Sequence, residues 1–198
     1  MKKIIVLGLG SGGMSVLNRG IFTSQLPENV ELISVNTDKQ LLERAKTTKK
    51  ILIGTNGLGA GGNPDSGKRA VEESEEKIKE AIKDADLLFL IAGFGGGTGT
   101  GASVKIAEIA KEFNIKTYAL ISYPFSFEGK KRNNQAINGY RELLGYADEI
   151  FVLHNDDMLK TLDRSATMAE AFQISDRLLS EKFFEIYRHE MRKEENND

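Results

Sequence analysis

Three glycine-rich loops constrain the fold of this 198-residue chain more than any other feature. They occupy residues 8–13, 57–63 and 93–101, at the ends of short apolar runs. Glycine tolerates positive φ and lets the backbone approach a ligand closely. A glycine loop between a strand and a helix presents several N–H groups and the positive end of the helix dipole, which together favour an anion such as phosphate. The loops therefore indicate a polyphosphate ligand, most naturally a nucleoside triphosphate.

The apolar runs predict the strands of a doubly wound α/β fold. Each run is almost continuously apolar, as in a parallel sheet that is covered on both faces. The runs are 4–7, 30–35, 51–53, 87–92, 117–121 and 150–153. Helical patterns separate them, including one over about 65–83. We therefore expect a mostly parallel, Rossmann-like sheet with helices on both faces and with the glycine loops beyond the carboxyl ends of the strands.

The last third of the chain predicts a single long helix followed by a tail. Apolar residues between 166 and 189 fall on one helical stripe. The residues after 189 are nearly all charged or amide-bearing, which is typical of a solvated terminus. We expect a nucleotide-binding domain over 1–165, a core helix of the same domain over 166–189 and a flexible charged tail over 190–198.

Composition excludes several classes of function. The 27 basic and 29 acidic residues nearly balance, which argues against a nucleic-acid partner. The absence of cysteine excludes disulfides, thiolate metal sites and a cysteine nucleophile. The two histidines, His154 and His189, are far apart in the sequence, so we predict no metal site. No apolar run approaches the roughly 20 residues that span a bilayer, so we expect no direct membrane insertion and a cytoplasmic location.

Two local patterns offer other interpretations of the glycine loops. The first loop satisfies G-x-G-x-x-G after a strand, which leaves open a dinucleotide-dependent oxidoreductase. However, Asn-Thr-Asp at 36–38 follows the second strand, where that fold needs an acidic residue at the strand's end. Segment 62–69 nearly spells a P-loop, but Arg69 replaces the hydroxyl residue that would hold Mg²⁺. We interpret Lys68 as a solvated helix side chain.

The run GGGTGTG at 95–101 resembles the signature motif of the tubulin/FtsZ family of GTPases. Other segments resemble further FtsZ motifs in the same order, so the resemblance reaches to about residue 189. These segments are NTD at 36–38, LGAGGNP at 58–64, PFSFEGKKR at 124–132, ND at 155–156 and AFQISD at 171–176. The resemblance implies that the domain binds GTP or GDP. Mg²⁺ would accompany GTP, held mainly by phosphates and water.

The resemblance also implies a role for each motif. The first and third loops would cradle the α- and β-phosphates through N–H groups and threonine hydroxyls, and the second would sense the γ-phosphate. Glu128 and Arg132 would lie near the ribose, although this spacing also suits a surface ion pair. Asn155 and Asp176 would read guanine, and Phe172 would stack on it. The predicted nucleotide-binding residues are Gly10, Ser11, Gly12, Gly13, Asn36, Ala60, Gly61, Gly62, Asn63, Gly95, Gly96, Gly97, Thr98, Gly99, Thr100, Glu128, Arg132, Asn155, Phe172 and Asp176.

Some positions depart from the FtsZ pattern. Ser11 interrupts the first glycine run, and His154 replaces a common proline. Met14 and Ser15 stand where FtsZ often has asparagines, one of which helps to bind the base. We expect these changes to weaken affinity or base selectivity. They leave the phosphate loops intact.

The part of the FtsZ pattern that completes the catalytic site has no counterpart here. In FtsZ the core helix leads to an acidic loop, N-x-D-F-A-D, which enters the nucleotide site of the next subunit in a head-to-tail filament. Residues 188–198 contain nothing similar, so we expect either a piece of a longer protein or a short family member. GTP hydrolysis is then weak or depends on a partner, either a second copy or a full-length FtsZ, in cell division or cytoskeletal filaments. No catalytic residue is predicted, although Glu190, Glu194, Glu195 or Asp198 offers a substitute acid.

Overall fold

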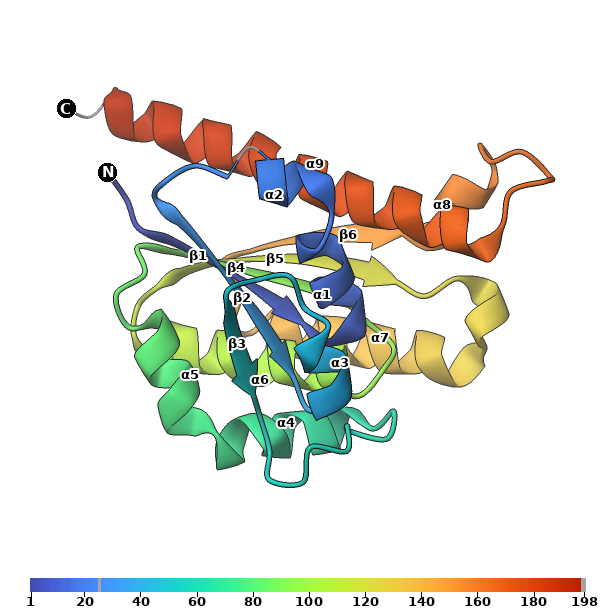
Figure 1. Ribbon diagram of the computed structural model, residues 1–198, viewed down its shortest axis with the longest axis horizontal. Coiled ribbons are helices and arrows are strands. Elements are labelled where there is room, and N and C mark those ends of the chain that lie inside the picture. The colour runs from blue at the N-terminus through green and yellow to red at the C-terminus, as the bar shows by residue number, and fades with distance from the viewer. Residues whose placement is uncertain (25, 197–198) are drawn as a thin grey trace.

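The computed structural model describes residues 1–24 and 26–196 and contains one six-stranded parallel sheet (Figure 1). The strands are β1 (Ile4–Leu9), β2 (Val30–Asn36), β3 (Lys49–Leu52), β4 (Leu87–Gly93), β5 (Lys116–Tyr123) and β6 (Glu149–His154). Their order across the sheet is β3-β2-β1-β4-β5-β6, and every pairing is parallel. Each predicted apolar run lies within or beside one of these strands. The predicted doubly wound α/β fold is therefore confirmed.

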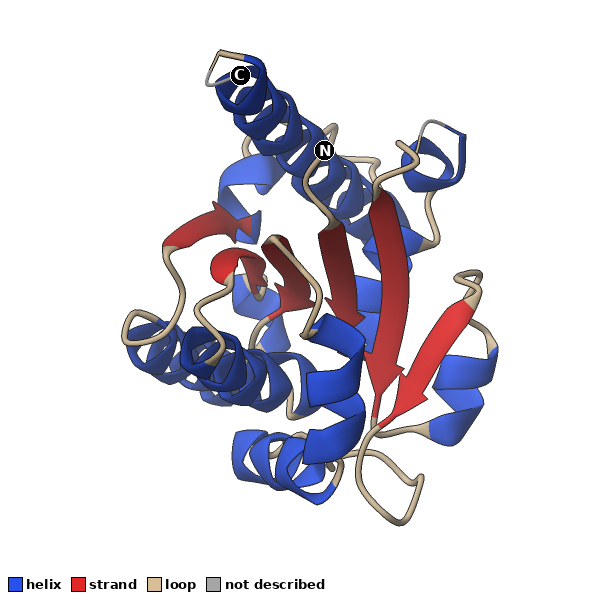
Figure 2. Cartoon of the chain, turned by 90° about the vertical axis from the view of Figure 1, so that its left-hand side faces the viewer, coloured by secondary structure: helices blue, strands red, loops and turns tan. Residues whose placement is uncertain are grey.

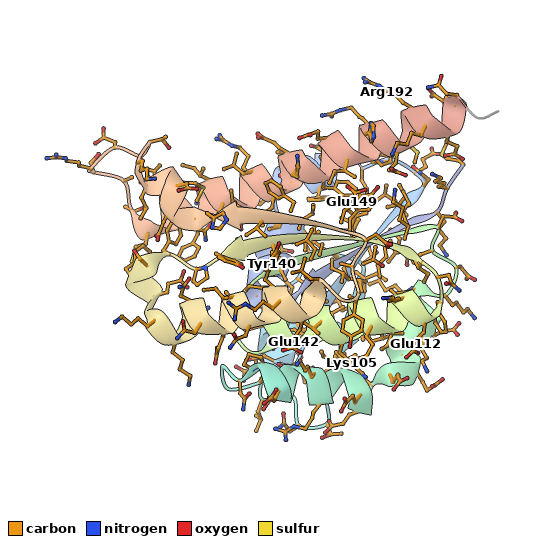
Figure 3. The ribbon with its side chains drawn as sticks, turned by 180° about the vertical axis from the view of Figure 1, so that it is seen from behind. Lys105, Glu112, Tyr140, Glu142, Glu149 and Arg192 are labelled. Atoms are coloured by element: carbon orange, nitrogen blue, oxygen red, sulfur yellow. The ribbon has the colours of Figure 1, made fainter. Side chains whose placement is uncertain are left out.

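Helices cover both faces of the twisted sheet (Figure 2). One face carries α1 (Gly10–Leu17), α2 (Gly20–Ser24) and α9 (Met168–Glu195). The other face carries α4 (Pro64–Glu73), α5 (Glu75–Ile82), α6 (Thr98–Glu112) and α7 (Lys130–Leu143). Figure 3 shows α9 on the opposite side of the sheet from α6 and α7. The remaining short elements are α3 (Lys39–Glu43), the 3-10 turn η1 (Ser126–Glu128) and α8 (Asn155–Leu159).

The near-continuous apolar runs are explained by two separate hydrophobic clusters, one on each face. Along β1, Ile4 and Val6 point into the cluster under α9, where Phe183 packs edge-on against Phe89 at 4.8 Å. Ile5 belongs to the cluster under α4–α7. Because successive side chains of a strand point to opposite faces, a strand that is covered on both sides is apolar at nearly every position.

The helix predicted over 65–83 is instead two helices, α4 and α5, which meet at Ser74. Ser74 has φ −118° and ψ 21°, and its hydroxyl accepts a hydrogen bond from the N–H of Gly54 at 2.9 Å. This contact with the segment after β3 holds the break. Both helices keep apolar residues toward the core, such as Val71 and Ile78. The helical periodicity of the sequence therefore does not reveal the break at Ser74.

The long C-terminal helix is also longer than the sequence suggests. It begins after Thr167, whose hydroxyl accepts the N–H of Glu170, and it continues through Glu195. The tail expected over 190–198 is therefore wrong for 190–195, which are helical, while 197–198 lie outside the described residues. In the described ranges, no helix combines the length and apolar character needed to cross a membrane.

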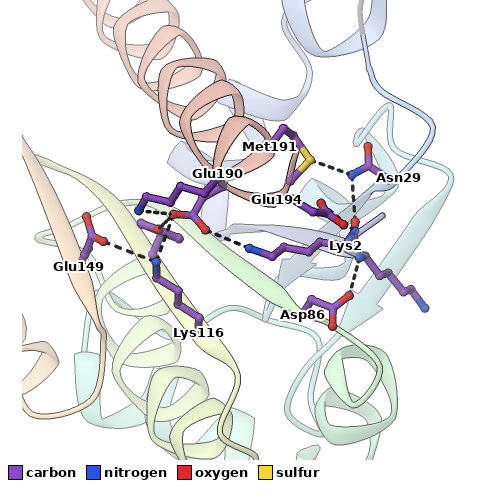
Figure 4. A network of polar contacts seen from close by, with 11 residues as sticks. Lys2, Asn29, Asp86, Lys116, Glu149, Glu190, Met191 and Glu194 are labelled. Carbon is purple, nitrogen blue, oxygen red and sulfur yellow. Dashed lines mark hydrogen bonds and ion pairs between the residues drawn. The ribbon is translucent and has the colours of Figure 1, made fainter. Parts of the chain in front are cut away.

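Glu190 explains why the helix continues, because it is a buried anchor and not a solvated tail residue. Only 2% of it is exposed, at the amino edge of the sheet (Figure 4). Its carboxylate accepts hydrogen bonds from Tyr118 Oη at 2.8 Å, from Lys116 and Lys193 at 3.2 Å and from Lys2 at 3.4 Å. Burial alone would raise the pKa of Glu190, but the hydrogen bonds from Tyr118, Lys193 and Lys116 outweigh burial and lower it to about 2.

Candidate functional site

The glycine loops meet where the strand order reverses, between β1 and β4. Helix α1 begins at Gly10, directly after β1, and α6 begins at Thr98, after the loop that follows β4. In an open α/β sheet, ligands bind in the crevice at this position, outside the carboxyl ends of the strands. A pocket of about 230 Å³ lies there. The predicted residues that line it are Gly10, Ser11, Asn36, Ala60, Gly62, Gly96, Gly97, Thr98, Gly99 and Arg132.

Two other predicted residues, Thr100 and Gly13, support the pocket without lining it. Thr100 is 1% exposed, and its hydroxyl accepts the N–H of Gly95 at 2.9 Å, so it holds the loop instead of facing a ligand. A Cβ on Gly13 would lie 2.1 Å from the carbonyl oxygen of Ile91. That glycine therefore lets α1 pack closely against β4. The sequence pattern does not separate such packing positions from positions that line the pocket.

The second glycine loop forms the exposed rim of the pocket. Gly61 and Gly62 have φ of 59° and 70°, and a Cβ on either would meet nothing within 4 Å. Asn63 does not line the pocket; its side chain accepts the N–H of Asp65 at 2.9 Å and caps α4. A Cβ on Gly97 would lie 2.8 Å from the backbone nitrogen of Asn63, so the second and third loops are in close contact.

Thr37 is a pocket residue that belongs to the NTD motif but was not among the predicted nucleotide-binding residues. Its hydroxyl lies 2.7 Å from that of Thr98, which joins the end of β2 to the start of α6. Asn36 shapes the same turn: its side-chain oxygen accepts the N–H groups of Thr37 and Asp38, and its amide donates to Met14 Sδ at 3.3 Å. Its position at the carboxyl end of a predicted strand could have identified Thr37 as a pocket residue.

Asp176, the predicted base-reading carboxylate, is held by Ser15 on α1 and by Arg19 in the short connection between α1 and α2. It is 7% exposed, and its Oδ2 accepts hydrogen bonds from Ser15 Oγ at 2.6 Å and Arg19 Nε at 3.1 Å. Burial raises the pKa of Asp176, and the hydrogen bonds from Ser15 and Arg19 oppose that rise. The end of α1 and the bend that follows it thus bring a hydroxyl and a guanidinium to the same carboxylate oxygen. The sequence marked Ser15 only as a departure from the FtsZ pattern and assigned no role to Arg19.

The other predicted base contacts surround the first turns of α9. Phe172 is 38% exposed and packs edge-on against Phe125 at 5.2 Å, so part of its ring is open. Asn155 is 3% exposed, and its side-chain oxygen accepts Ser175 Oγ at 2.9 Å. These residues and Asp176 do not line the pocket between the glycine loops. They form a second region next to it.

Glu128 and Arg132 form the ion pair that their spacing allows, with Nε 3.3 Å from the carboxylate. Glu128 also accepts the N–H of Phe125 at 2.7 Å, which fixes the turn before α7. The guanidinium of Arg132 lies beside Gly96, where a Cβ would be 3.7 Å from it. Arg132 thus brings a positive charge to the rim of the pocket and is held there by Glu128.

The segment that nearly spells a P-loop is the start of α4. Lys68 is a side chain of this helix, as the sequence predicted, and forms an ion pair at the surface with Glu142 of α7, which is labelled in Figure 3. It does not line the pocket between the glycine loops. Gly67 has a packing role, because a Cβ there would lie 2.3 Å from the carbonyl oxygen of Gly97.

Residues 3–163 match the model of the tubulin/FtsZ family, GTPase domain. The chain belongs to the tubulin/FtsZ family. This match covers the strands, the glycine loops and the pocket between them. The matched model is that of the GTPase domain, and it gives no support to the dinucleotide-dependent oxidoreductase considered above.

Solved structures of family members share the fold. An FtsZ from M. jannaschii, described as an empty dimer, is 40% identical, with a TM-score of 0.84 over 90% of this chain and 52% of that chain. A CetZ from Methanosaeta thermophila is 26% identical, with a TM-score of 0.79 over 95% of this chain and 54% of that chain. CetZ1 from Haloferax volcanii, in a GDP-bound form, is 22% identical with a TM-score of 0.78 over 90% and 58%. The chain spans about half the length of these relatives.

Proposed function

We propose that this domain binds GTP and GDP, with the phosphates between the glycine loops and guanine beside Asp176. The observation that carries the proposal is the meeting of the α1 and α6 N-termini with the exposed second loop in one pocket. Helix N-termini attract anions through unpaired N–H groups and the helix dipole. The buried carboxylate of Asp176 matches the N1–H and N2–H₂ donors of guanine, which adenine lacks.

Mg²⁺ would enter with the triphosphate. Among the described residues, no group of three His, Cys, Asp or Glu side chains could hold a metal ion. Mg²⁺ commonly keeps several waters and binds through substrate phosphates. The chemistry of the pocket therefore fits an ion carried by the nucleotide, and its part would be to neutralise charge on the phosphate oxygens.

Hydrolysis of GTP would need a group from a second molecule. Of the described residues that line the pocket, the only carboxylate is Asp38, and its Oδ1 accepts the N–H of Leu41 as the cap of α3. Glu190, considered above as a substitute acid, is buried among lysines at the amino ends of the strands, on the far side of the sheet from the pocket. Phosphate release should rise faster than linearly with protein concentration. A linear rise would mean that one subunit is enough.

The partner would be a second copy of the chain or a full-length FtsZ in a head-to-tail contact, as part of a cytoskeletal or cell-division filament. The M. jannaschii relative is described as a dimer, which supports self-association as the first possibility to examine. Sedimentation of the protein with GTP, alone and mixed with full-length FtsZ, tests both. Unchanged sedimentation in both experiments would contradict a role in filaments.

Calorimetry with GTP, GDP, ATP and NAD tests the nucleotide proposal directly. GTP and GDP should bind, whereas ATP and NAD should not. In a parallel thermal-unfolding experiment, a bound nucleotide raises the unfolding temperature with its concentration relative to Kd. Stabilisation by NAD alone would overturn the proposal.

Replacing Asp176 with alanine should reduce the preference for guanine over adenine. Hydrogen bonds to a charged group contribute about 1.5–3 kcal/mol, so the ratio of GTP to ATP affinity should fall by roughly 10- to 100-fold. Competition binding with both nucleotides measures this ratio. Gln173→Ala is the control, because Gln173 is exposed on the same turn of α9. An unchanged ratio in Asp176→Ala would show that Asp176 does not read the base.

A further inference from the structure

Gln135 joins the second glycine loop to the third. It lies on α7, outside the motifs that the sequence resemblance singles out, and its side chain is half-buried. Its amide nitrogen donates to the carbonyl oxygen of Gly95 at 2.6 Å and to that of Gly62 at 3.1 Å. An amide nitrogen carries two hydrogens, so this one side chain satisfies one acceptor on each loop.

The contact decides which way the backbone of the second loop faces. The carbonyl of Gly62 is turned to Gln135, and the N–H of Asn63 bonds to the carbonyl of Ala60 at 3.1 Å. Among the hydrogen bonds of the described residues, none uses the N–H of Gly61 or Gly62. A carbonyl oxygen repels an anion, whereas successive N–H groups attract one. Gln135 therefore keeps the repelling group occupied and leaves the loop donors available.

The two loops depend on this side chain to different extents. The third loop has another anchor, because Thr100 Oγ accepts the N–H of Gly95 at 2.9 Å. At the tip of the second loop, a Cβ on Gly61 or Gly62 would meet nothing within 4 Å, so side-chain packing does not hold the tip in place. Loss of Gln135 should therefore disturb the second loop and leave the third nearly unchanged.

We propose that Gln135 is a positioning residue that sets the preference for GTP over GDP. The inference rests on the proposed function and on the roles that the family resemblance implies for the loops: the second loop contacts the γ-phosphate, and the third contacts the phosphates that GTP and GDP share. Gln135 acts through the Gly62 carbonyl and does not touch the nucleotide. Its removal selectively weakens binding of the third phosphate.

The test is calorimetry with GTP and with GDP on the variant Gln135→Met, which keeps the side-chain length and removes the donor. One lost anchor of this kind predicts about tenfold weaker GTP binding, with GDP binding changed less than about twofold. Asn134→Met is the matched control, because Asn134 is the exposed neighbour of Gln135 on α7. It should change neither affinity.

The ratio of the two affinities separates positioning from a general structural role. Equal weakening of GTP and GDP, or no weakening of either, would overturn the role of Gln135 while leaving nucleotide binding in place. Wild-type protein that binds neither nucleotide would overturn the proposed function and this inference with it. If thermal unfolding shows that Gln135→Met does not fold, Gln135→Ala removes the same donor with a smaller side chain.

Discussion

Gly97→Ala is expected to weaken GTP and GDP binding at least ~100-fold, which corresponds to about 2.7 kcal/mol. Gly97 has φ −81° and ψ −57°, a backbone conformation that alanine adopts without strain. The new Cβ, however, would lie 2.8 Å from both Ala60 Cβ and the nitrogen of Asn63. The second and third loops would have to separate, and the pocket between them would lose its shape. Calorimetry with each nucleotide measures the loss.

A control variant separates this effect from general damage to the fold. Gly145→Ala adds the same methyl group at an exposed turn, where the Cβ would be 3.4 Å from the carbonyl oxygen of Glu142. It should bind nucleotide like the wild type. Gly97→Ala should still unfold cooperatively, because the displaced loop lies at the surface. Affinity within about threefold of the wild type would contradict the close apposition of the two loops.

Glu190→Gln is expected to lower the stability of the domain by about 3 kcal/mol, because breaking a buried ion pair costs about 3–5 kcal/mol and the lysines here are partly exposed. For a domain of this size, that loss lowers the unfolding temperature by roughly 6–12 °C. Thermal unfolding measures the difference. Glu185→Gln on the same helix is the control: Glu185 is exposed and pairs with Lys182 three residues away, so its loss should have little effect. Equal effects of the two variants would contradict the anchoring role of Glu190.

The same carboxylate predicts a dependence of stability on acid. The pKa of Glu190 is about 2 in the folded protein and 4.5 as its ordinary value. A lowered folded-state pKa means that the unfolded chain takes up the proton first, so the stabilisation is full above pH 4.5 and is lost as pH falls toward 2. Urea unfolding of wild type and Glu190→Gln should therefore differ at pH 7 and converge near pH 2–3. A gap that is constant with pH would show that the charge of Glu190 is not the cause.

The strands and the phosphate loops could be predicted from the sequence because their signals are local. A strand buried on both faces must be apolar at nearly every position, as in β4 (Leu87–Gly93). Glycine loops can be recognised from composition, because few other residues let the backbone come as close to a ligand. These features depend on neighbouring residues in the chain, so one sequence is enough to find them.

The side chains that hold the site together could not be predicted in this way. Arg19 meets Asp176 across 157 positions in the sequence, and Gln135 meets Gly62 across 73. Such contacts exist only once the helices are packed on the sheet. The break at Ser74 and the burial of Glu190 have the same origin, because each follows from a partner on a distant segment. Their own residue types, serine and glutamate, suggest solvent exposure.

The place of each strand in the sheet divides the pocket into parts of unequal rigidity. The loops after β1 and β4 extend from the two central strands, which separate only when the whole sheet opens. The second glycine loop follows β3, a strand of four residues at the sheet's edge, where local opening costs far less. The inner part of the pocket therefore opens only together with the core of the sheet, while the outer rim, apart from its contacts with the third loop and Gln135, can open at a lower cost in free energy.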